Sequence, residues 1–425
     1  MSMAYMKKLT ETVYDVIVVG GGPAGMLAAA SAALTLKRVL LIEKNEFCGK
    51  KLRITGKGRC NVCPDVTVPE VLENIPVGGK FLMSALNRFP PESVQSFFTG
   101  NGVPLKTERG RRVFPVSDRA ADVAECLVRV MGERGVRTLR AQVNELIIRD
   151  GTIKGVLVDG MELHAPAVIV ATGGLSYPLT GSTGDGYAFA RAAGHRVSEC
   201  SGSLVPVEIV GGECRKMAGL NLRNVGLKLY GKKKKPVYQD FGEALFMSYG
   251  MSGPVILSAS AHMNEKDGPY VIELDLKPAL DEGKLDVRIL RDFSERSNDN
   301  IYDGLRALLP RQMIPVILDR CRIPSSLPVH SVTKEARRKI LDEMKHFRLT
   351  VHQKRPVEEA IVTRGGVKLS EVDPASMESK LVRGLFFAGE ILDCDAYTGG
   401  YNLQIAWSTG YAAGISCGNR ARDMV

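Results

Sequence analysis

The chain opens with the pattern of a strand, a glycine-rich turn, a helix and a second strand. The apolar runs 15–19 and 39–43 have the length and β-branched content of buried strands, and the alanine-rich stretch 26–36 has the composition of a helix. Glycines in the turn 20–25 divide this apolar region, which argues against a membrane span or a signal peptide. The order predicts a βαβ unit at the start of a parallel sheet.

The hydrophobic period changes twice in the next stretch. Apolar residues three and four positions apart predict a helix over 119–134. Alternation around two Asp-Gly dipeptides predicts a small antiparallel meander over 143–163. The apolar runs 168–171 and 385–388 are typical of buried parallel strands, and 404–417 is small and apolar enough for a helix packed closely on a sheet. The two predicted strands extend the first sheet, and the predicted helix 404–417 packs on it.

The middle of the chain has a different character, with short strands, basic turns and a helical stretch near 286–309. We interpret it as an insert that interrupts the nucleotide-binding domain. The predicted boundaries are 12–205 for the first part of that domain, 206–355 for the insert and 356–425 for the second part.

Length and composition fit this organisation. With 425 residues, 44% hydrophobic and 24% charged, the chain is long enough for two or three folded domains, and global disorder is excluded. The net charge of +10 permits attraction to nucleic acid, phosphorylated ligands or anionic membranes and establishes none of them. Nine cysteines, an odd number scattered along the chain, argue against a disulfide framework and favour a reduced, cytoplasmic protein.

The turn after the first strand carries a dinucleotide fingerprint, Gly20-x-Gly22-x-x-Gly25. The first glycine permits a tight turn, the second lets the backbone approach a pyrophosphate, and the third lets helix and strand pack closely. The helix N-terminus attracts the anion. Glu43 ends the second strand, where a carboxylate accepts hydrogen bonds from ribose hydroxyls.

Three further motifs favour FAD over NAD as the resident dinucleotide. A flavin needs a carboxylate or amide near its ribityl chain and backbone donors near its pyrimidine carbonyl. Glu390 and the helix start near Gly399 can supply both, and Thr172-Gly173 ends a strand facing the same ligand. Because no second glycine fingerprint follows, we expect NAD(P)H to visit only transiently as hydride donor.

Several stretches together resemble one bacterial family. The stretches 49–61, 112–115, 181–186, 252–254 and 384–393 are similar to those of NAD(P)/FAD-dependent oxidoreductases that comprise the BaiN-like, RdsA-like and aminoacetone oxidase family flavoproteins. The resemblance covers nearly the whole chain. It implies an α/β fold in which a glutathione-reductase-type FAD-binding Rossmann domain is interrupted by an insert with a β-barrel-like and a helical subdomain.

The resemblance also implies positions for individual residues. Lys51, Arg59, Cys60 and Asn61 would lie along the flavin and its phosphates, and Val143 would meet the adenine through its backbone. Together with the motifs above, the residues expected to bind FAD are Gly20, Gly22, Pro23, Ala24, Gly25, Glu43, Lys44, Lys51, Gly58, Arg59, Cys60, Asn61, Val143, Thr172, Gly173, Gly389, Glu390, Gly399, Gly400, Asn402 and Leu403.

The expected activity is NAD(P)H-driven reduction of an electron-poor C=C bond, either in ribosomal RNA uridine, giving dihydrouridine, or in a bile-acid or steroid enone. Cys60 and Tyr401 are the candidate proton donors, with solvent as the alternative source, and Arg59 or Arg364 could polarise a carbonyl. The alternative is a flavin-binding RNA or ribosome-assembly factor without significant turnover. A small molecule or RNA, ribosomal RNA included, is the expected partner; no membrane partner is expected, and the oligomeric state is left open.

Two features have an ordinary and a functional interpretation. Cys60-x-x-Cys63 could be a working dithiol or simple packing, and zinc would need a second pair that the sequence lacks. No histidine spacing suggests a metal, so we expect none. The basic clusters 232–235 and 334–339 are either solvated surfaces or contacts for RNA phosphates.

Overall fold

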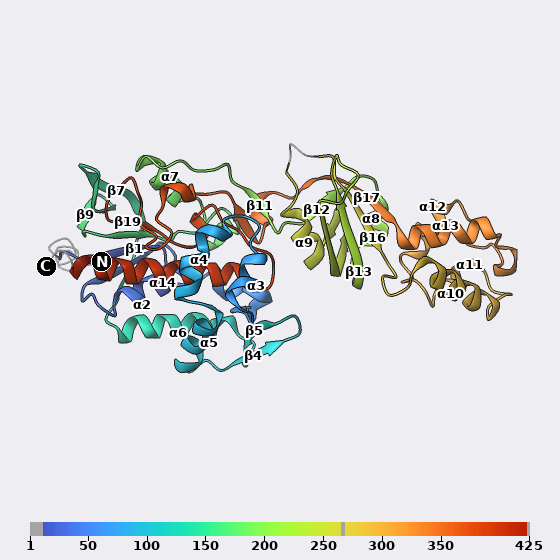
Figure 1. The fold of residues 1–425 in the computed structure, drawn as a ribbon, viewed down its shortest axis with the longest axis horizontal. Coiled ribbons are helices and arrows are strands. Elements are labelled where there is room, and N and C mark those ends of the chain that lie inside the picture. Colours follow the sequence, from blue (N-terminus) through green and yellow to red (C-terminus); the bar gives the residue numbers. More distant parts are fainter. Residues whose placement is uncertain (1–11, 265–267, 423–425) are drawn as a thin grey trace. The chain divides into compact units, whose positions relative to one another are not determined.

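The computed structural model describes residues 12–264 and 268–422. The chain forms two compact units, the first made of the residues up to Gly202 and from Ala360 onward, the second of Ser203–Glu359 (Figure 1). The units divide at 202/203 and 359/360, whereas the sequence analysis predicts domain boundaries at 205/206 and 355/356. Each unit has its own hydrophobic core.

The centre of the first unit is a five-stranded parallel sheet, which confirms the predicted α/β Rossmann-type architecture. Its register pairs Val18 with both Leu41 and Ile169, and Ile169 with Phe386. Apolar residues fill the three central strands because the sheet is buried on both faces. In spatial order the strands are β19 (Leu385–Phe387), β10 (Val168–Val170), β1 (Val16–Val19), β2 (Val39–Glu43) and β6 (Arg137–Arg140).

Helix α14 (Tyr401–Arg422) lies along α2 (Pro23–Ala32), as Figure 1 shows. Its residues Gly410, Gly414 and Gly418 permit this contact, because a Cβ there would overlap Ala24 O, Ala28 O or the Thr35 side chain. The sequence analysis expects this helix on a sheet, but its main partners are α2 and α4. The alanine-rich face of α2 meets a helix whose small residues recur every fourth position, so two backbones approach closely.

The other elements of the first unit surround the sheet. The predicted antiparallel meander is present, with Leu157 opposite Glu145 and Glu162, and the β7–β8 register shifts at two places. The surrounding elements are β7 (Val143–Arg149), β8 (Thr152–Val158), β9 (Met161–His164), η1 (Leu52–Gly58), β3 (Cys63–Pro64), α3 (Val68–Glu73), α4 (Gly79–Arg88), α5 (Pro91–Gly100), β4 (Leu105–Glu108), β5 (Arg112–Pro115), α6 (Ala120–Glu133), η2 (Pro178–Thr180), α7 (Asp185–Ala192), β11 (Ser201–Ser203), β18 (Val362–Arg364), η6 (Leu369–Glu371) and η7 (Gly389–Ile391). The short helix η5 (Val357–Glu359) belongs to the second unit.

The second unit contains a closed six-stranded barrel and a group of helices, as the resemblance implies. The barrel order is β12 (Val207–Ile209), β15 (Gly250–Ser252), β14 (Tyr238–Met247), β13 (Asn221–Tyr230), β16 (Val271–Asp275) and β17 (Phe347–Lys354). The helical stretch expected near 286–309 is wrong as one element, because Asn300 caps a new helix. The helices are α8 (Glu213–Lys216), α9 (Pro254–Ser260), α10 (Glu282–Ser294), α11 (Ile301–Gly304), α12 (Ile314–Cys321), η4 (Val329–Ser331) and α13 (Lys334–Lys345).

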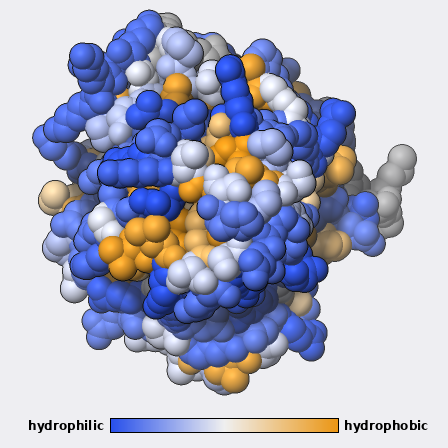
Figure 2. Space-filling view, turned by 90° about the vertical axis from the view of Figure 1, so that its right-hand side faces the viewer, coloured by the Kyte–Doolittle hydropathy of each residue, from blue (hydrophilic) through white to orange (hydrophobic). Residues whose placement is uncertain are grey.

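Hydrophilic residues prevail on the face that Figure 2 shows, and several apolar areas lie between them. Within residues 12–264 and 268–422, no helix combines the length and hydropathy that a bilayer crossing requires.

Candidate functional site

The three glycines of the fingerprint between β1 and α2 have different surroundings. A Cβ at Gly25 would overlap Gly20 O, and one at Gly20, where φ is +105°, would lie 2.5 Å from Ala171 O. A Cβ at Gly22 would meet no described heavy atom within 4 Å. Two glycines are therefore required by packing, whereas Gly22 faces open space at the start of α2.

Helix α2 begins without a side-chain cap, with Gly22 at the N-cap and Pro23 in the first turn. Its first backbone N–H groups are consequently available for an anion. Gly389 adjoins this end of the helix, because a Cβ on it would lie 2.8 Å from the Cβ of Ala24. The C-terminal motif and the fingerprint thus meet at one place.

Glu43 is buried at the end of β2 and is held on both carboxylate oxygens. Its Oε2 accepts from Gly21 N at 2.7 Å, and its Oε1 accepts from Asn45 N and Asn45 Nδ2, each at 2.7 Å. The backbone of Ala141, two residues before Val143, donates to Glu43 O at 3.0 Å. The carboxylate and Val143 at the start of β7 therefore lie at the same edge of the sheet.

A second carboxylate, Glu390, is the centre of a polar network. Its Oε1 accepts from Thr363 N at 2.8 Å and from Ser176 Oγ at 3.0 Å, while Lys51 Nζ lies 3.2 Å from Oε2 and donates to Ser176 Oγ at 2.9 Å. Thr363 Oγ1 also accepts from Leu175 N and Ser176 N. Burial acts to raise the pKa of Glu390, but the Lys51 ammonium and these hydrogen bonds outweigh it, so its pKa lies below the ordinary value.

Sequence reasoning missed Ser176 and Thr363 in this network. Neither residue stands in a recognisable motif, and the hydrogen bond between them joins positions 187 apart in the chain. Gly173 lies beside them, since a Cβ on it would be 3.0 Å from Ser182 Oγ and 4.0 Å from Glu390 Oε2. Only the fold brings these residues to the end of β10.

The third group of expected residues lies at the start of α14. A Cβ at Gly400 would be 2.7 Å from Cys63 C and 2.9 Å from Asn61 Oδ1, so two distant motifs touch here. The Asn402 side chain closes the preceding loop, accepting from Ala396 N at 2.9 Å and donating to Ala396 O at 2.7 Å. Asn402 and its neighbour Leu403 can therefore offer backbone groups, while the Asn402 amide shapes the loop.

Two buried side-chain oxygen atoms among the residues expected to bind FAD have no protein partner. Thr172 Oγ1, directly after β10, and Asn61 Oδ1 are both buried without a hydrogen bond. A buried polar group normally has a partner, and an exception calls for an explanation. Together with the uncapped start of α2 and the open side of Gly22, these orphan atoms fit a bound polar ligand at the junction of the three groups.

Two basic residues among those expected to bind FAD have protein carboxylates as partners. Lys44 Nζ lies 2.6 Å from Asp185 Oδ2, and the Arg59 guanidinium contacts Glu108 and Asp118. Hydrogen bonds from Arg59 to these two carboxylates raise its pKa above the ordinary value. Arg59 also lies over the Phe114 ring, with Cζ 4.3 Å from the centroid. Gly58, whose φ is +84°, precedes Arg59 and faces open space among the described residues.

The three candidate catalytic residues differ in accessibility. Cys60 is fully buried, and burial raises the pKa of its thiol to about 12, so it is a very weak acid at neutral pH. Tyr401 is half-buried, and burial raises its pKa as well. Arg364 is half-buried and directly follows Thr363 in β18. Arg364 is therefore the chain neighbour of Thr363, which belongs to the Glu390 network.

The Cys60 and Cys63 thiols are both free and buried. Burial raises the pKa of Cys63 as it does that of Cys60. Thiolates are the reactive form, so neither group has the environment of an activated cysteine. Within the described residues, no cluster of three or more His, Cys, Asp or Glu side chains could hold a metal ion.

Comparison with known proteins shows the family to which this chain belongs. The model of the HI0933-like protein Rossmann domain matches residues 14–416. The chain belongs to the HI0933-like family. Two curated relatives span nearly the same length: the 3-dehydro-bile acid delta(4,6)-reductase of Clostridium scindens, 29% identical over 95% of this chain and 98% of the relative, and the ribosomal RNA dihydrouridine synthase of Escherichia coli, 28% identical over 94% and 96%.

Solved structures agree on the fold of this family member. The 3-ketosteroid delta1-dehydrogenase of Sterolibacterium denitrificans superposes with a TM-score of 0.52 at 15% identity, covering 96% of this chain and 100% of that one. The 3-ketosteroid-delta4-(5alpha)-dehydrogenase of Rhodococcus jostii gives a TM-score of 0.50 at 16% identity, with 97% and 98% covered. At such identities the likeness concerns the fold alone.

The HI0933-like chain is therefore an FAD-dependent oxidoreductase with a Rossmann-type FAD-binding domain. Its residues fit the cofactor: the start of α2 and Gly22 would hold the pyrophosphate, and Glu43 the ribose. Glu390, Thr172 and Asn61 would face the polar atoms of the flavin and its ribityl chain.

Proposed function

We propose that this protein uses NAD(P)H to reduce a C=C bond conjugated to a carbonyl group. Bound FAD supplies a carrier that accepts a hydride from one reactant and delivers it to another. The observation that carries the proposal is the near full-length similarity to two relatives named as a bile-acid delta(4,6)-reductase and a dihydrouridine synthase. Uridine and a steroid enone both place the alkene beside a carbonyl, so one reaction type accounts for both names.

Different residues of the site bind the cofactor, supply the proton and polarise the substrate carbonyl. Glu390, fixed by Lys51, Ser176 and Thr363, orients the cofactor and keeps its own charge at neutral pH. We assign the proton that completes the reduction to Tyr401, because solvent reaches this side chain and does not reach Cys60. Arg364 would polarise the substrate carbonyl, which withdraws electrons from the alkene.

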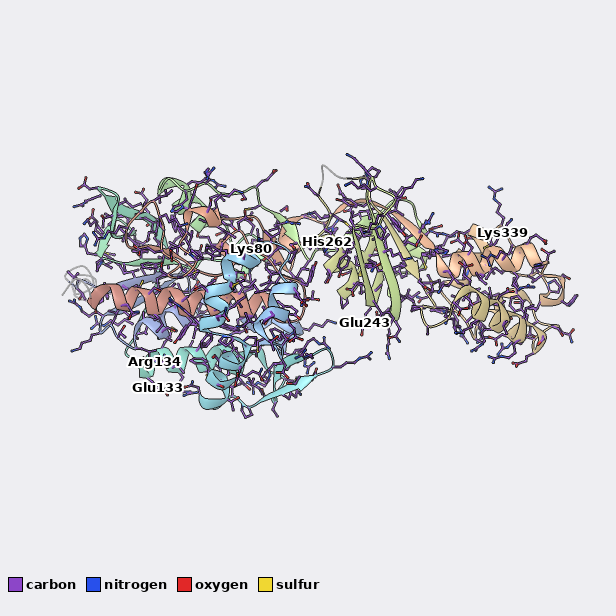
Figure 3. All side chains as sticks on the ribbon, viewed as in Figure 1. Lys80, Glu133, Arg134, Glu243, His262 and Lys339 are labelled. Atoms are coloured by element: carbon purple, nitrogen blue, oxygen red, sulfur yellow. The ribbon has the colours of Figure 1, made fainter. Side chains whose placement is uncertain are left out.

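The charges of the second unit weaken one argument for an RNA substrate. Arg337 Nε lies 2.8 Å from Asp286, and Arg338 Nη2 lies 2.5 Å from Glu282, so each arginine already has a carboxylate partner. Lys233 to Lys235 are exposed, and Lys339 extends away from α13 (Figure 3). RNA phosphates would therefore be contacted by lysines in preference to the arginine pair.

Anaerobic mixing of the purified flavoprotein with NADPH, and separately NADH, tests the proposal. We expect the absorbance of the oxidised flavin to bleach within seconds and to return on addition of substrate. Two substrates are compared: a 3-oxo-Δ4 steroid acid, and ribosomal RNA from a strain that lacks the gene, in which dihydrouridine is read by mass spectrometry as a gain of two hydrogens. A flavin that neither donor reduces would contradict the proposal and favour the flavin-binding RNA factor without turnover.

A cytoplasmic location stays a prediction. It is supported by the nine free thiols of the chain, since disulfides are rare in reducing compartments. A fluorescent fusion followed by fractionation would test it.

A further inference from the structure

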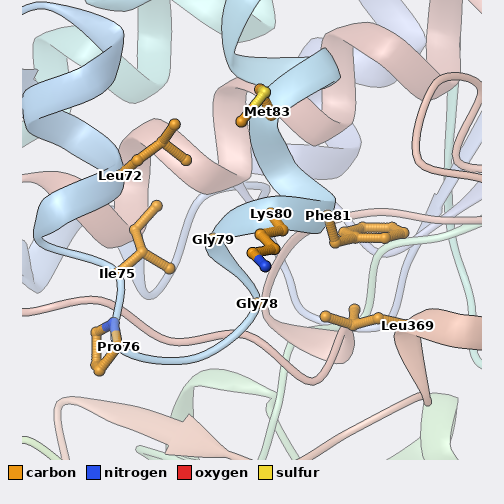
Figure 4. A pocket seen from close by; sticks show the side chains of 9 residues that line it. All are labelled: Leu72, Ile75, Pro76, Gly78, Gly79, Lys80, Phe81, Met83 and Leu369. Atoms are coloured by element: carbon orange, nitrogen blue, oxygen red, sulfur yellow. The ribbon is translucent and has the colours of Figure 1, made fainter.

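The pocket between α3 and the start of α4 in the first unit is lined mainly by apolar side chains (Figure 4). Its single charged residue, Lys80, is exposed, so the lining does not concentrate charge around a ligand. The second unit differs, because α10 and the loop before it gather several charges at one place. Three cations there, Lys277, Arg288 and Arg291, interact with a single carboxylate, that of Asp292.

The buried Asp292 carboxylate fixes this basic cluster. Arg288 Nε lies 2.8 Å from Asp292 Oδ1 and 2.9 Å from Oδ2, while Arg291 Nη2 lies 3.3 Å from Oδ1. Within the part of the chain that the structure describes, no other carboxylate forms an ion pair with Lys277, Arg288 or Arg291. Three positive charges therefore share one negative charge, which leaves two of them uncompensated.

Arg288 has donors to spare. Its hydrogen bonds to Asp292 use only Nε, and its two terminal nitrogens bond to no residue that the structure describes. A guanidinium carries its N–H donors in a fixed planar fork. Asp292 thus orients the side chain of Arg288 and leaves the outer edge of the fork able to donate to a ligand.

Lys277 stands beside Arg288 with its ammonium unused. Its backbone is fixed, because Lys277 N donates to Asp275 Oδ1 at 2.9 Å and Lys277 O accepts from Lys345 Nζ at 3.2 Å. Its half-buried side chain forms no hydrogen bond or ion pair with a described residue. Burial and the Arg288 guanidinium lower the pKa of Lys277, and the attraction of Asp292 opposes them only in part. An added anion would relieve this cost.

We propose that Lys277 and Arg288 form a binding site for phosphate groups in the second unit. The arginine fork matches two phosphate oxygens, and the lysine adds a point charge to a third. The two uncompensated charges suit one free phosphate or two neighbouring phosphates of a nucleic-acid backbone, whereas a carboxylate offers only two oxygens. The inference goes beyond the proposed function, since no step of the reduction uses this cluster.

Isothermal titration calorimetry of the flavin-loaded protein with inorganic pyrophosphate tests the site. Bound FAD keeps the start of α2 occupied, so that end of the helix does not compete for the probe. Lys277→Met keeps the apolar stem and should weaken pyrophosphate binding about tenfold, as expected for the loss of one hydrogen bond to a charged group. The matched control is Lys284→Met, also on α10, whose ammonium pairs with Asp281 at 3.2 Å; it should leave the affinity unchanged.

Two further measurements separate a binding site from a structural cluster. Without pyrophosphate, Lys277→Met should keep or raise the thermal midpoint, because it removes a desolvated cation beside Arg288. Arg288→Lys retains a charge for Asp292 but loses the planar fork, so it should fold and also weaken pyrophosphate binding about tenfold. This second variant decides the matter if Lys277→Met fails to fold.

A single-stranded oligonucleotide, titrated into the same variants, distinguishes the two sources of phosphate. Weaker binding of both probes by Lys277→Met assigns the site to a nucleic-acid backbone, and weaker binding of pyrophosphate alone assigns it to a free phosphate. The proposal is overturned if pyrophosphate does not bind saturably to the wild type, or if Lys277→Met and Lys284→Met change its affinity equally. It is also overturned if Lys277→Met lowers the thermal midpoint and leaves the affinity unchanged.

Discussion

The Glu390 network of the first unit and the Arg337 and Arg338 ion pairs of the second unit differ in how many partners share each charge. Glu390 is held by Lys51, Ser176 and Thr363 at the end of a buried strand. In the second unit, Arg337 and Arg338 each meet one carboxylate of α10. Near this network, Thr172 Oγ1 and Asn61 Oδ1 are buried without a partner, and such groups indicate a ligand because leaving them unsatisfied is costly. Single ion pairs that solvent reaches contribute little to the free energy of unfolding and do not by themselves indicate a ligand.

Substitution of Gly25 in the first unit should cause the largest loss of stability. Gly25→Val places a branched side chain against Gly20 O, and the turn cannot yield without separating α2 from β1. We expect the free energy of unfolding to fall by about 3 kcal/mol or more, as in overpacked cores. Gly132→Val in α6 is the control, because its Cβ meets no described atom within 4 Å, and it should cost under about 0.5 kcal/mol. Equal effects in urea titrations would contradict the packing argument.

Thr363→Val should have the next largest effect. The valine has nearly the same shape but cannot accept the hydrogen bonds from Leu175 N and Ser176 N. Two buried donors left unsatisfied should cost about 2 to 4 kcal/mol in a denaturant titration. Thr350→Val, on an exposed position of β17 in the second unit, should cost less than about 0.5 kcal/mol. A neutral Thr363→Val would show that the network does not stabilise the first unit.

The charge of Glu390 predicts a pH dependence. Its pKa is below the ordinary carboxyl value of 4.5 in the folded protein, so its contribution to stability is complete above about pH 4.5 and disappears as the pH falls through the lower folded value. Glu390→Gln should reduce stability at pH 7 by about 1 to 3 kcal/mol. The difference between wild type and variant should shrink below pH 4.5. A difference that stays constant down to about pH 3 would refute the depressed pKa.

The second unit provides the smallest expected effect, on RNA binding. Replacing Lys233, Lys234 and Lys235 by glutamine should lower the slope of log affinity against log salt by roughly one for each phosphate that a lysine no longer neutralises. Replacing Arg337 and Arg338 should change the slope less, since both already pair with carboxylates. Filter binding to ribosomal RNA fragments measures both. A larger effect from the arginine pair would reverse the interpretation of this surface.

The sequence indicates those parts of the site whose chemistry lies within a short motif. The glycine fingerprint, Glu43 and a helix start near Gly399 all follow from local spacing, and α14 begins at Tyr401. Long-range partners could not be predicted: Lys44 finds Asp185, and Arg59 finds Glu108, only through the fold. A basic residue next to a motif can pair with a distant carboxylate as well as with a phosphate. A single sequence does not show which of these partners it has.

Helix packing shows the same limit. The glycines of α14 recur at every fourth position and are visible in the sequence, but their partner could equally be a strand or a helix. The fold decides this because α2 is itself rich in alanine, so that only two small-residue faces can approach this closely. Composition predicted close packing, and topology determined the partner.

The flavin content of Gly22→Val tests the central claim most directly. Gly22 has φ −78° and ψ −178°, which valine adopts without strain, and its Cβ faces open space. The variant should therefore fold with the thermal midpoint of flavin-stripped wild type, yet purify colourless, while wild type carries about one FAD per chain because its backbone can approach the pyrophosphate. A yellow, fully loaded Gly22→Val protein would contradict the placement of the cofactor at the start of α2.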